Sequence, residues 1–384
     1  MAERDQGTGD LTSDEAVRVS SLELFSDLVF AFAVTRLTTV LVNDPTWIGL
    51  SHVLLLFGVI WWIYGGYIWL TNAVRPDRPI RKLLLLGAMA GFLIMGLAIP
   101  RAFEGDGVVF GVGYLIVVVI HTGLFTQAAG ISRIAGVVRV APFNLVSAVL
   151  LIVAGLASGA AETVLWVAAL AIQVVTPFLA RTESYRIEPS HFVERYGLLV
   201  LIVLGESILA VGAGGKNQSL SAALVGTSVL GLALTAALWW AYFEGDLERA
   251  EAVLRATPDT RRPARALAAF FYAQIPMFLG VVAIAAAIKT SLPRPTAAAA
   301  QSQAWLLAGG AAAFLAGNLW FRAVLGIRCG IWRMLATPAA LVTAVVGLTF
   351  STAAQLAVLD AMLIIALVAE SREEHRHGTG ADAA

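Results

Sequence analysis

The charged residues inside long apolar stretches of this sequence are the ones whose types and spacing could do chemistry. Glu23 and Asp27 lie four residues apart in one such stretch, and Glu206 lies in another, between Gly205 and Ser207. A charged residue at the centre of a bilayer costs about 2.5–3.5 kcal/mol on the insertion scale. Such a residue therefore needs a proton, an ion or a partner of opposite charge. The chemistry that these residues predict is proton or cation binding.

Glu206 is the strongest single candidate. In a helix it lies about 18 Å beyond Glu194, well inside the apolar stretch. Its small neighbours allow another helix to approach closely, and an unpaired carboxylate there either takes up a proton or finds a cation. The alternative is a buried interhelical ion pair or hydrogen bond that only fixes packing.

Further charged residues precede Glu206 on the same stretch, namely His191, Glu194 and Arg195. At about 100° per residue, His191, Arg195 and Glu206 fall within a stripe of roughly 60°. By the same rule Glu23 and Asp27 share one face of the first stretch. We expect Asp27 and Arg195 to form an inner pair on a polar path.

Three other polar residues are secondary candidates. His121 lies near the middle of its stretch and could relay protons, because its reference pKa is about 6.5, although a lone histidine more often makes an interhelical hydrogen bond. Asp360 interrupts an almost wholly apolar stretch. Arg36 is expected to extend toward the outer surface.

The composition places these residues in a membrane. The chain has 384 residues, of which 59% are hydrophobic and 14% charged, and its mean hydropathy is +0.80. Soluble domains carry about 25% charged residues, so we expect the lipid bilayer as the main partner. The zero net charge gives no reason to expect nucleic acid. The one cysteine, Cys329, excludes an intrachain disulfide, and we find no motif for a metal or a cofactor.

The apolar stretches predict an all-α polytopic membrane protein with about twelve transmembrane helices, each near the length that spans a bilayer. The expected segments are 20–42, 47–71, 81–100, 108–130, 141–158, 163–180, 192–214, 219–243, 265–289, 302–324, 332–350 and 353–370.

The charges of the loops predict the orientation. With a cytoplasmic N-terminus, the inner segments hold 20 Lys and Arg residues and the outer segments hold 4. This imbalance predicts that both termini lie in the cytoplasm. The aromatic groups at 61–69 and 239–242 are expected in the interfacial belts, and Asp246 is expected to be a solvated helix cap.

The two halves of the chain resemble each other. Aligning Glu23 with Glu194, an offset of 171, matches SLELFSDLVFAFAVTRL with FVERYGLLVLIVLGESI without a gap, and WWIY at 61–64 then parallels WWAY at 239–242. Six segments separate the equivalents, and because six is even the repeats must share one orientation in the membrane.

This repeat predicts how the chain is divided. We expect a disordered cytoplasmic N-terminus, a first six-helix repeat, a cytoplasmic linker, a second six-helix repeat and a disordered cytoplasmic tail. Their boundaries are 1–19, 20–180, 181–191, 192–370 and 371–384.

Two motifs resemble those of a known family. LELFSDLVF at 22–30, followed by Ala33-Val34-Thr35, looks like the motif that opens the bacterial low temperature requirement A proteins. HF-x-ER-x-GL at 191–198, with LGES at 204–207, is similar to that family's second motif. The family carries an aromatic residue at the position of Ser26 and usually Gln where this chain has Arg36. The resemblance covers about 20–370 and implies a multispanning cytoplasmic-membrane protein associated with growth in the cold.

Phe25-Ser26-Asp27 also resembles part of a motif in the first helix of lysosomal and bacterial potassium channels, which are likewise built from six-helix repeats. Ser21 stands where those channels have an arginine. This likeness adds to the hypothesis of transport.

Three functions remain open from the sequence. The leading hypothesis is passive or ion-coupled transport of a small solute or ion, with the first and seventh helices lining a polar path. The second is an intramembrane enzyme acting on a lipid or apolar metabolite, with Glu206, His121 or His191 as acid and base. The third is a non-catalytic stress-response protein of the membrane.

Overall fold

The computed structural model describes residues 20–73, 78–128, 131–180, 187–216 and 218–381. These residues form helices α1 (Ser21–Asn43), α2 (Trp47–Ala73), α3 (Pro79–Ala98), η1 (Ile99–Arg101), α4 (Gly107–Ala128), α5 (Ile131–Ala154), α6 (Ala160–Ala180), α7 (Pro189–Gly214), α8 (Ala222–Phe243), α9 (Asp246–Ala256), α10 (Arg262–Ala266), η2 (Leu267–Tyr272), α11 (Gln274–Ser291), α12 (Gln301–Leu325), α13 (Ile331–Thr349) and α14 (Thr352–Ala381).

The prediction of an all-α polytopic membrane protein is confirmed. The structure is 85% helical, and its described residues contain no strand. Ten helices in the described part of the chain are long and apolar enough to cross a membrane. The helices α5 and α6 add two shorter apolar stretches, Val140–Ala154 and Ala160–Thr176. Together they occupy the positions of the twelve expected segments.

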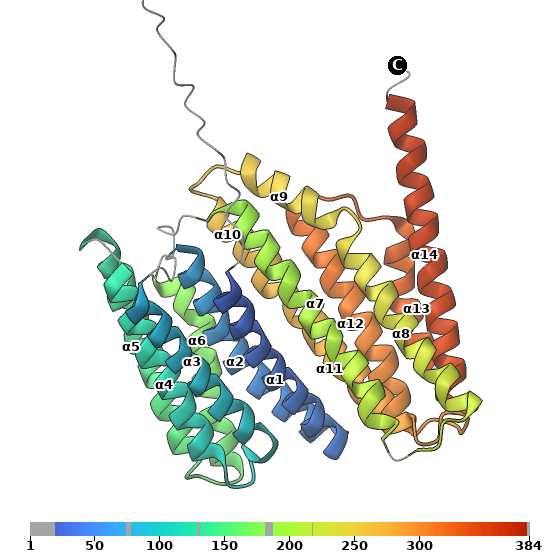
Figure 1. Ribbon diagram of the computed structural model, residues 1–384, viewed down its shortest axis with the longest axis horizontal. Coiled ribbons are helices and arrows are strands. Elements are labelled where there is room, and N and C mark those ends of the chain that lie inside the picture. Colours follow the sequence, from blue (N-terminus) through green and yellow to red (C-terminus); the bar gives the residue numbers. More distant parts are fainter. Residues whose placement is uncertain (1–19, 74–77, 129–130, 181–186, 217, 382–384) are drawn as a thin grey trace, which may run out of the picture.

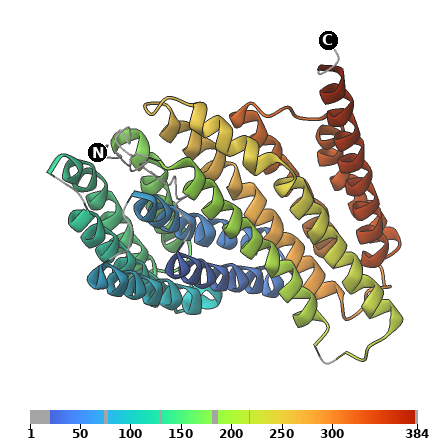
Figure 2. The ribbon, with the colours of Figure 1, turned by 45° about the horizontal axis from the view of Figure 1, so that its top comes forward.

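The long helices lie side by side as a bundle, and α1 is at its centre (Figure 1). Helices α1–α6 form one group and α7–α14 form the other, as the blue-green and yellow-red ribbons show (Figure 2). α1 packs against α7 and α11 of the second group, and α2 also contacts α7. The contact between the two groups is therefore made mainly by α1, α2, α7 and α11.

The same succession of helix pairs occurs in both groups. In the first, α1 packs on α2 and α3, the chain continues through the pairs α3–α4, α4–α5 and α5–α6, and α6 returns to α2. In the second, α7 packs on α8 and α11, the chain continues through α11–α12, α12–α13 and α13–α14, and α14 returns to α8.

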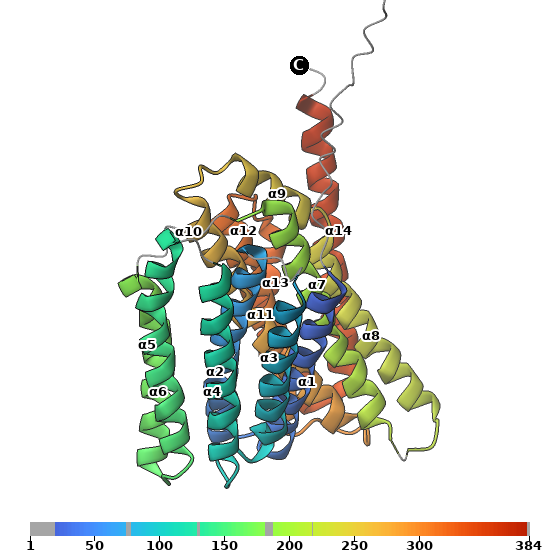
Figure 3. The same ribbon diagram turned by 60° about the vertical axis from the view of Figure 1, so that its left-hand side comes forward.

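A short helix lies across one end of the bundle. α9 carries acidic residues in its first turn and Arg255 in its last turn. These charges interact favourably with the helix dipole at both ends. It is at the end where α7 begins, and α14 extends beyond the other helices there (Figure 3). The segment between the eighth and ninth spans is thus a structured cover rather than a bare loop.

The ninth span begins with a wide helical turn that contacts the first group of helices. In η2, the Ala273 amide donates to the carbonyl of Ala268, five residues back. Pro276 has no amide hydrogen to donate one turn later. The carbonyl of Phe271 in this segment accepts a hydrogen bond of 3.1 Å from Nε1 of Trp61.

The expected interfacial belt at 61–69 is wrong for several of its aromatic residues. Trp61, Tyr64 and Tyr67 are buried. Trp61 packs edge-on against Phe278 of α11, with 5.0 Å between the ring centroids, while Tyr64 stacks on Phe30 of α1 at 4.2 Å. An aromatic side chain is stable both when it is buried between helices and when it lies at the membrane surface. The position of these residues near the end of a span therefore did not show which of the two environments they occupy.

Candidate functional site

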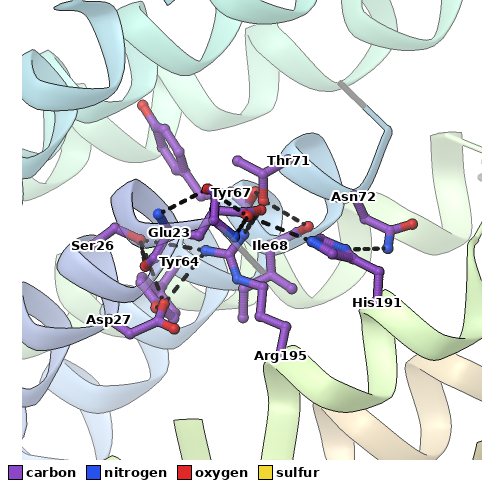
Figure 4. Close-up of polar contacts among 11 residues, drawn as sticks. Glu23, Ser26, Asp27, Tyr64, Tyr67, Ile68, Thr71, Asn72, His191 and Arg195 are labelled. Carbon is purple, nitrogen blue, oxygen red and sulfur yellow. Dashed lines mark hydrogen bonds and ion pairs between the residues drawn. The ribbon is translucent and has the colours of Figure 1, made fainter. Parts of the chain in front are cut away.

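A buried charged cluster joins the beginnings of α1 and α7, and Arg195 is its centre (Figure 4). We call Glu23, Asp27, Tyr64, Thr71, His191 and Arg195 the inner cluster. Arg195 Nη1 donates to Glu23 Oε1 at 2.8 Å and also to the Thr71 hydroxyl, and its Nη2 lies 3.4 Å from Asp27 Oδ1. One guanidinium therefore binds two carboxylates of the other helix group, as the predicted pairing of Asp27 with Arg195 requires.

Glu23 is held by the start of its own helix as well as by α7. The backbone amide and hydroxyl of Ser20 donate to Glu23 Oε2 at 2.9 and 2.8 Å, and the Glu23 amide donates back to the Ser20 hydroxyl. This reciprocal pair is a capping box, which satisfies amides at the start of a helix. The same carboxylate thus orders the first turn of α1 and binds α7.

Asp27 is fully buried in the inner cluster. The hydroxyl of Tyr64 donates to Asp27 Oδ1, the atom that also faces Arg195. Asp27 Oδ2 has no hydrogen-bond partner among the described residues. The sequence did not indicate Tyr64, although the parallel WWIY and WWAY segments draw attention to its position.

His191 links Glu23 to α2. Its Nδ1 lies 3.1 Å from Nδ2 of Asn72, and its Nε2 lies 3.5 Å from Glu23 Oε2. The oxygen of the Asn72 amide accepts from the Glu188 amide, so its nitrogen is the end that faces the imidazole. Because that nitrogen donates to Nδ1, the hydrogen of a neutral imidazole sits on Nε2 and points to Glu23.

Glu206 forms a separate polar contact further along the interface. It is only 6% exposed, and its Oε2 accepts a hydrogen bond of 2.5 Å from the hydroxyl of Thr35 on α1. Thr38, one helical turn further along α1, also faces the carboxylate. Lys289 at the end of α11 is a positively charged side chain that attracts the carboxylate. Ser207 is buried beside it, and its hydroxyl oxygen has no hydrogen-bond partner in the described structure.

An apolar layer separates Glu206 from the inner cluster. Thr35 follows Asp27 by eight residues, about 12 Å along the helix. Phe30 and Val34 lie between them on α1 and are both 1% exposed. The structure therefore places two polar sites, one at each end of a packed aromatic and aliphatic segment, on the same interface.

The other predicted residues lie elsewhere. Glu194 is exposed on α7. Arg36 is half-buried, with its guanidinium 5.9 Å above the ring of Phe32. His121 packs against Tyr67 within the first helix group, with 5.0 Å between the ring centroids. Asp360 is buried in α14, and neither carboxylate oxygen has a hydrogen-bond partner among the described residues.

The structure contains a second buried charged cluster, which we did not predict from the sequence. It joins α9, α12, α13 and α14 and consists of Asp246, Asn318, Arg322, Arg333 and Glu370. Arg333 Nη2 lies 2.9 Å from Glu370 Oε2, and Arg322 Nε lies 3.5 Å from Asp246 Oδ1. The expectation of a solvated cap at Asp246 is therefore wrong, because α9 packs on α7, α8 and α12 and its first residue, Asp246, lies against Arg322 and Arg333. In the sequence, the only indication of this cluster is that Arg322 and Arg333 lie on either side of the short connection between α12 and α13.

Neither cluster resembles a metal centre. Within the described residues, no group of three or more His, Cys, Asp and Glu side chains is arranged to hold a metal ion. Each carboxylate of the inner cluster instead faces the guanidinium of Arg195, an arrangement that neutralises buried charge in pairs.

Comparison with known proteins identifies the family. The sequence model described as "Bacterial low temperature requirement A protein (LtrA)" matches residues 18–369. The chain belongs to this family. The match includes the inner cluster and Glu206, so both polar sites lie in the part of the chain that the LtrA family shares.

A curated relative is also similar along most of its length. It is the protein of Rhizobium meliloti (strain 1021) named "Uncharacterized protein RA0937", which is 28% identical over 323 residues, covering 81% of this chain and 78% of the relative. With its helical architecture, the chain is a multi-pass membrane protein of the LtrA family.

Proposed function

We propose that this LtrA protein transports a small solute or ion across the bacterial cytoplasmic membrane, passively or coupled to an ion, and that Glu206 is its proton or cation site. The observation that carries the proposal is a buried carboxylate within α7 whose hydrogen-bond partner is a hydroxyl of the opposite helix group. A charge at that position is costly in hydrocarbon. Binding a proton or a cation removes the cost.

The surroundings of Glu206 differ from those of Glu23 in a way that supports this role. Glu23 has an arginine at 2.8 Å, so its charge is neutralised within the protein. Glu206 accepts from a threonine hydroxyl instead, and no salt bridge within 4 Å of it is found in the described residues. A neutral partner leaves the carboxylate free to exchange a proton or an ion.

The interface between the helix groups supplies a surface for the motion that transport needs. In many transporters two repeats rock against each other around a central site. We propose that α1–α6 and α7–α14 are such repeats. The alignment of the two halves and the matching succession of helix pairs support this division.

The proposed enzyme has less support from the geometry. His191 and Glu206 lie on one helix, 15 residues or about 22 Å apart, and His121 contacts Tyr67 within the first group. An acid and a base must both be within hydrogen-bond reach of one substrate. His191 and Glu206 are too widely separated to serve as such a pair.

We expect Glu206→Gln to lower proton flux at least tenfold in proteoliposomes that contain a pH-sensitive dye. The flux is driven by a potassium diffusion potential, with and without a polar metabolite extract outside. The amide keeps the size and a hydrogen-bond acceptor but cannot exchange a proton at the working pH. Glu194→Gln is the matched control, because Glu194 is exposed on the same helix, and it should retain at least half of the flux.

Two results would contradict this proposal. One is equal flux in the wild-type protein and Glu206→Gln. The other is wild-type flux no greater than that of empty vesicles under both conditions.

The orientation has its own test. We propose that the connection between α12 and α13, which carries Cys329, faces the cytoplasm together with both termini. A membrane-impermeant maleimide should label Cys329 in inverted vesicles and not in intact spheroplasts. Ser219→Cys in a Cys329→Ser background is the control, because Ser219 is exposed beyond the opposite end of α7 and should show the reverse pattern. Labelling of Cys329 from outside would overturn the orientation.

A further inference from the structure

We infer that Glu206 and Thr35 form one proton-binding site on a pseudo-twofold axis between the two helix groups, so that either group can carry the carboxylate. The inference rests on the repeat and the transport role proposed above. It adds the ligand, a proton, and makes a statement about symmetry that the transport role alone does not require.

The first step is the sequence separation of the contact. The first and seventh apolar segments align at an offset of 171 residues, over 21–37 and 192–208. The hydrogen bond from Thr35 to Glu206 joins positions 171 residues apart. In a twofold arrangement two equivalent positions touch only where the axis passes between them. The Thr35–Glu206 contact therefore marks a point on that axis.

The second step is that α1 and α7 also contact each other near their first turns, at nearly the same sequence separation. Arg195 binds Glu23 and Asp27, at separations of 172 and 168 residues. α1 and α7 thus run in the same direction and stay close to the repeat offset from the inner cluster to Glu206, about 11 residues or 16 Å along α7. Over this length α1 and α7 keep the register that a twofold relation between the two helices requires.

The third step concerns the ligand. Sodium sites in transporters use carbonyl groups that broken helices leave free, whereas α1 and α7 are continuous past Thr35 and Glu206. The hydroxyl of Thr35 donates its hydrogen directly to the carboxylate, an arrangement that holds the two oxygens together without a metal ion. Lys289 of the neighbouring α11 also faces the pair, and its positive charge opposes the binding of a proton and of a metal cation alike. A proton fits this site better than a metal cation.

The fourth step is what the symmetry allows. Because the two positions face each other across the axis, a carboxylate at 35 and a hydroxyl at 206 would recreate the same pair with the roles of α1 and α7 exchanged. The equivalents of the two flanking hydroxyl residues differ, because Thr38 aligns with Leu209 and Ser207 with Arg36 at the offset of 171, so the exchange tests the Thr35–Glu206 pair itself. The site is thus a property of the axis and not of one helix.

The test is an exchange of side chains in the full-length protein. Glu206→Thr removes the carboxylate, and the double variant Thr35→Glu/Glu206→Thr returns it from the other helix. The double variant Thr38→Glu/Glu206→Thr is the matched control, because it places the carboxylate one helical turn away from the position equivalent to 206. The measurements are proton flux in proteoliposomes and the infrared band of a protonated carboxylic acid, followed as a function of pH and identified by its shift in heavy water.

We expect Glu206→Thr to lose the pH-dependent carboxylic acid band and at least tenfold in flux. Thr35→Glu/Glu206→Thr should regain the band and reach flux within threefold of the wild type, whereas the Thr38 double variant should not. If Glu206→Thr loses flux and the Thr35 exchange fails to regain the band, or if both exchanges regain it equally, the symmetry inference is overturned and the transport proposal stands.

The remaining outcomes are also decisive. Unchanged flux in Glu206→Thr rejects the transport role, and the infrared band in the exchange variant then decides the inference by itself. If Thr35→Glu/Glu206→Thr does not fold, Thr35→Gln/Glu206→Thr serves as its neutral counterpart. Folding of the Gln variant alone would show that position 35 does not accept a carboxyl group, and failure of both variants to fold would show that positions 35 and 206 are not interchangeable; either result would overturn the inference.

Discussion

Replacing Arg195 with alanine is expected to lower the stability of the protein by about 3–5 kcal/mol. The guanidinium is 1% exposed and binds both Glu23 and Asp27. Removing it leaves two buried carboxylates close together without a positive partner. Breaking a buried pair from one side is costly because the remaining charge has lost both its solvent and its partner.

The measurement is the thermal unfolding midpoint in detergent, followed by tryptophan fluorescence. Arg101→Ala is the control, because Arg101 is 64% exposed and its partner Asp106 lies 3.7 Å away; exposed pairs contribute about 0–1 kcal/mol. Arg195→Lys should be intermediate, because it restores one charge but not the planar fork that binds two carboxylates at once. Equal midpoints for Arg195→Ala and Arg101→Ala would show that the inner cluster does not stabilise the fold.

The number and type of the helices followed from the sequence because lipid restricts the possible structures. Inside hydrocarbon the backbone must satisfy its own hydrogen bonds, which leaves helices as the natural form for long apolar segments. The length of each segment then reports the thickness of the bilayer. For these reasons hydropathy alone located the spans, including α5 and α6 with only a short connection between them.

The candidate site could be predicted only in part, because helical periodicity gives the angle of a side chain but not its partner. Glu23, Asp27, His191 and Arg195 were predicted from charge in apolar segments, and the structure brings them together. Glu194 was included on the same grounds and is exposed. At 100° per residue Glu194 and Arg195 point to different sides of α7, and only the packing of α1 decides which side is buried.

Residues that look ordinary in sequence were the harder case. Asp246 follows a glycine at the start of a helix, which is typical of a solvated cap. In the structure its carboxylate is buried beside Arg322, because α9 turns back over the bundle. That turn depends on contacts between segments about 75 residues apart, and no local pattern encodes them. Tyr64 was hidden in the same way within an apolar aromatic run.

The second large effect is expected at the close approach of α11 and α12. A side-chain carbon added at Gly310 would lie 2.6 Å from the carbonyl oxygen of Gly280, and one added at Gly280 would lie 2.5 Å from that of Gly310. Both obstacles are backbone atoms, which cannot move without separating the helices. We expect Gly310→Ala to destabilise the protein by about 3 kcal/mol, at the upper end of the usual cost of overpacking.

The neighbouring glycine supplies the control for this prediction. A carbon added at Gly309 meets no atom within 4 Å, so Gly309→Ala should leave the unfolding midpoint unchanged or raise it slightly, because alanine favours a helix over glycine by up to about 1 kcal/mol. Gly310→Ala should lower it by several degrees. In a membrane the hydrophobic effect does not hold helices together, so association depends on close packing of this kind. Equal midpoints for the two variants would mean that α11 and α12 can separate at little cost, and α11, which also packs on α1 and α7, would then be a mobile part of the interface around Glu206 rather than its fixed support.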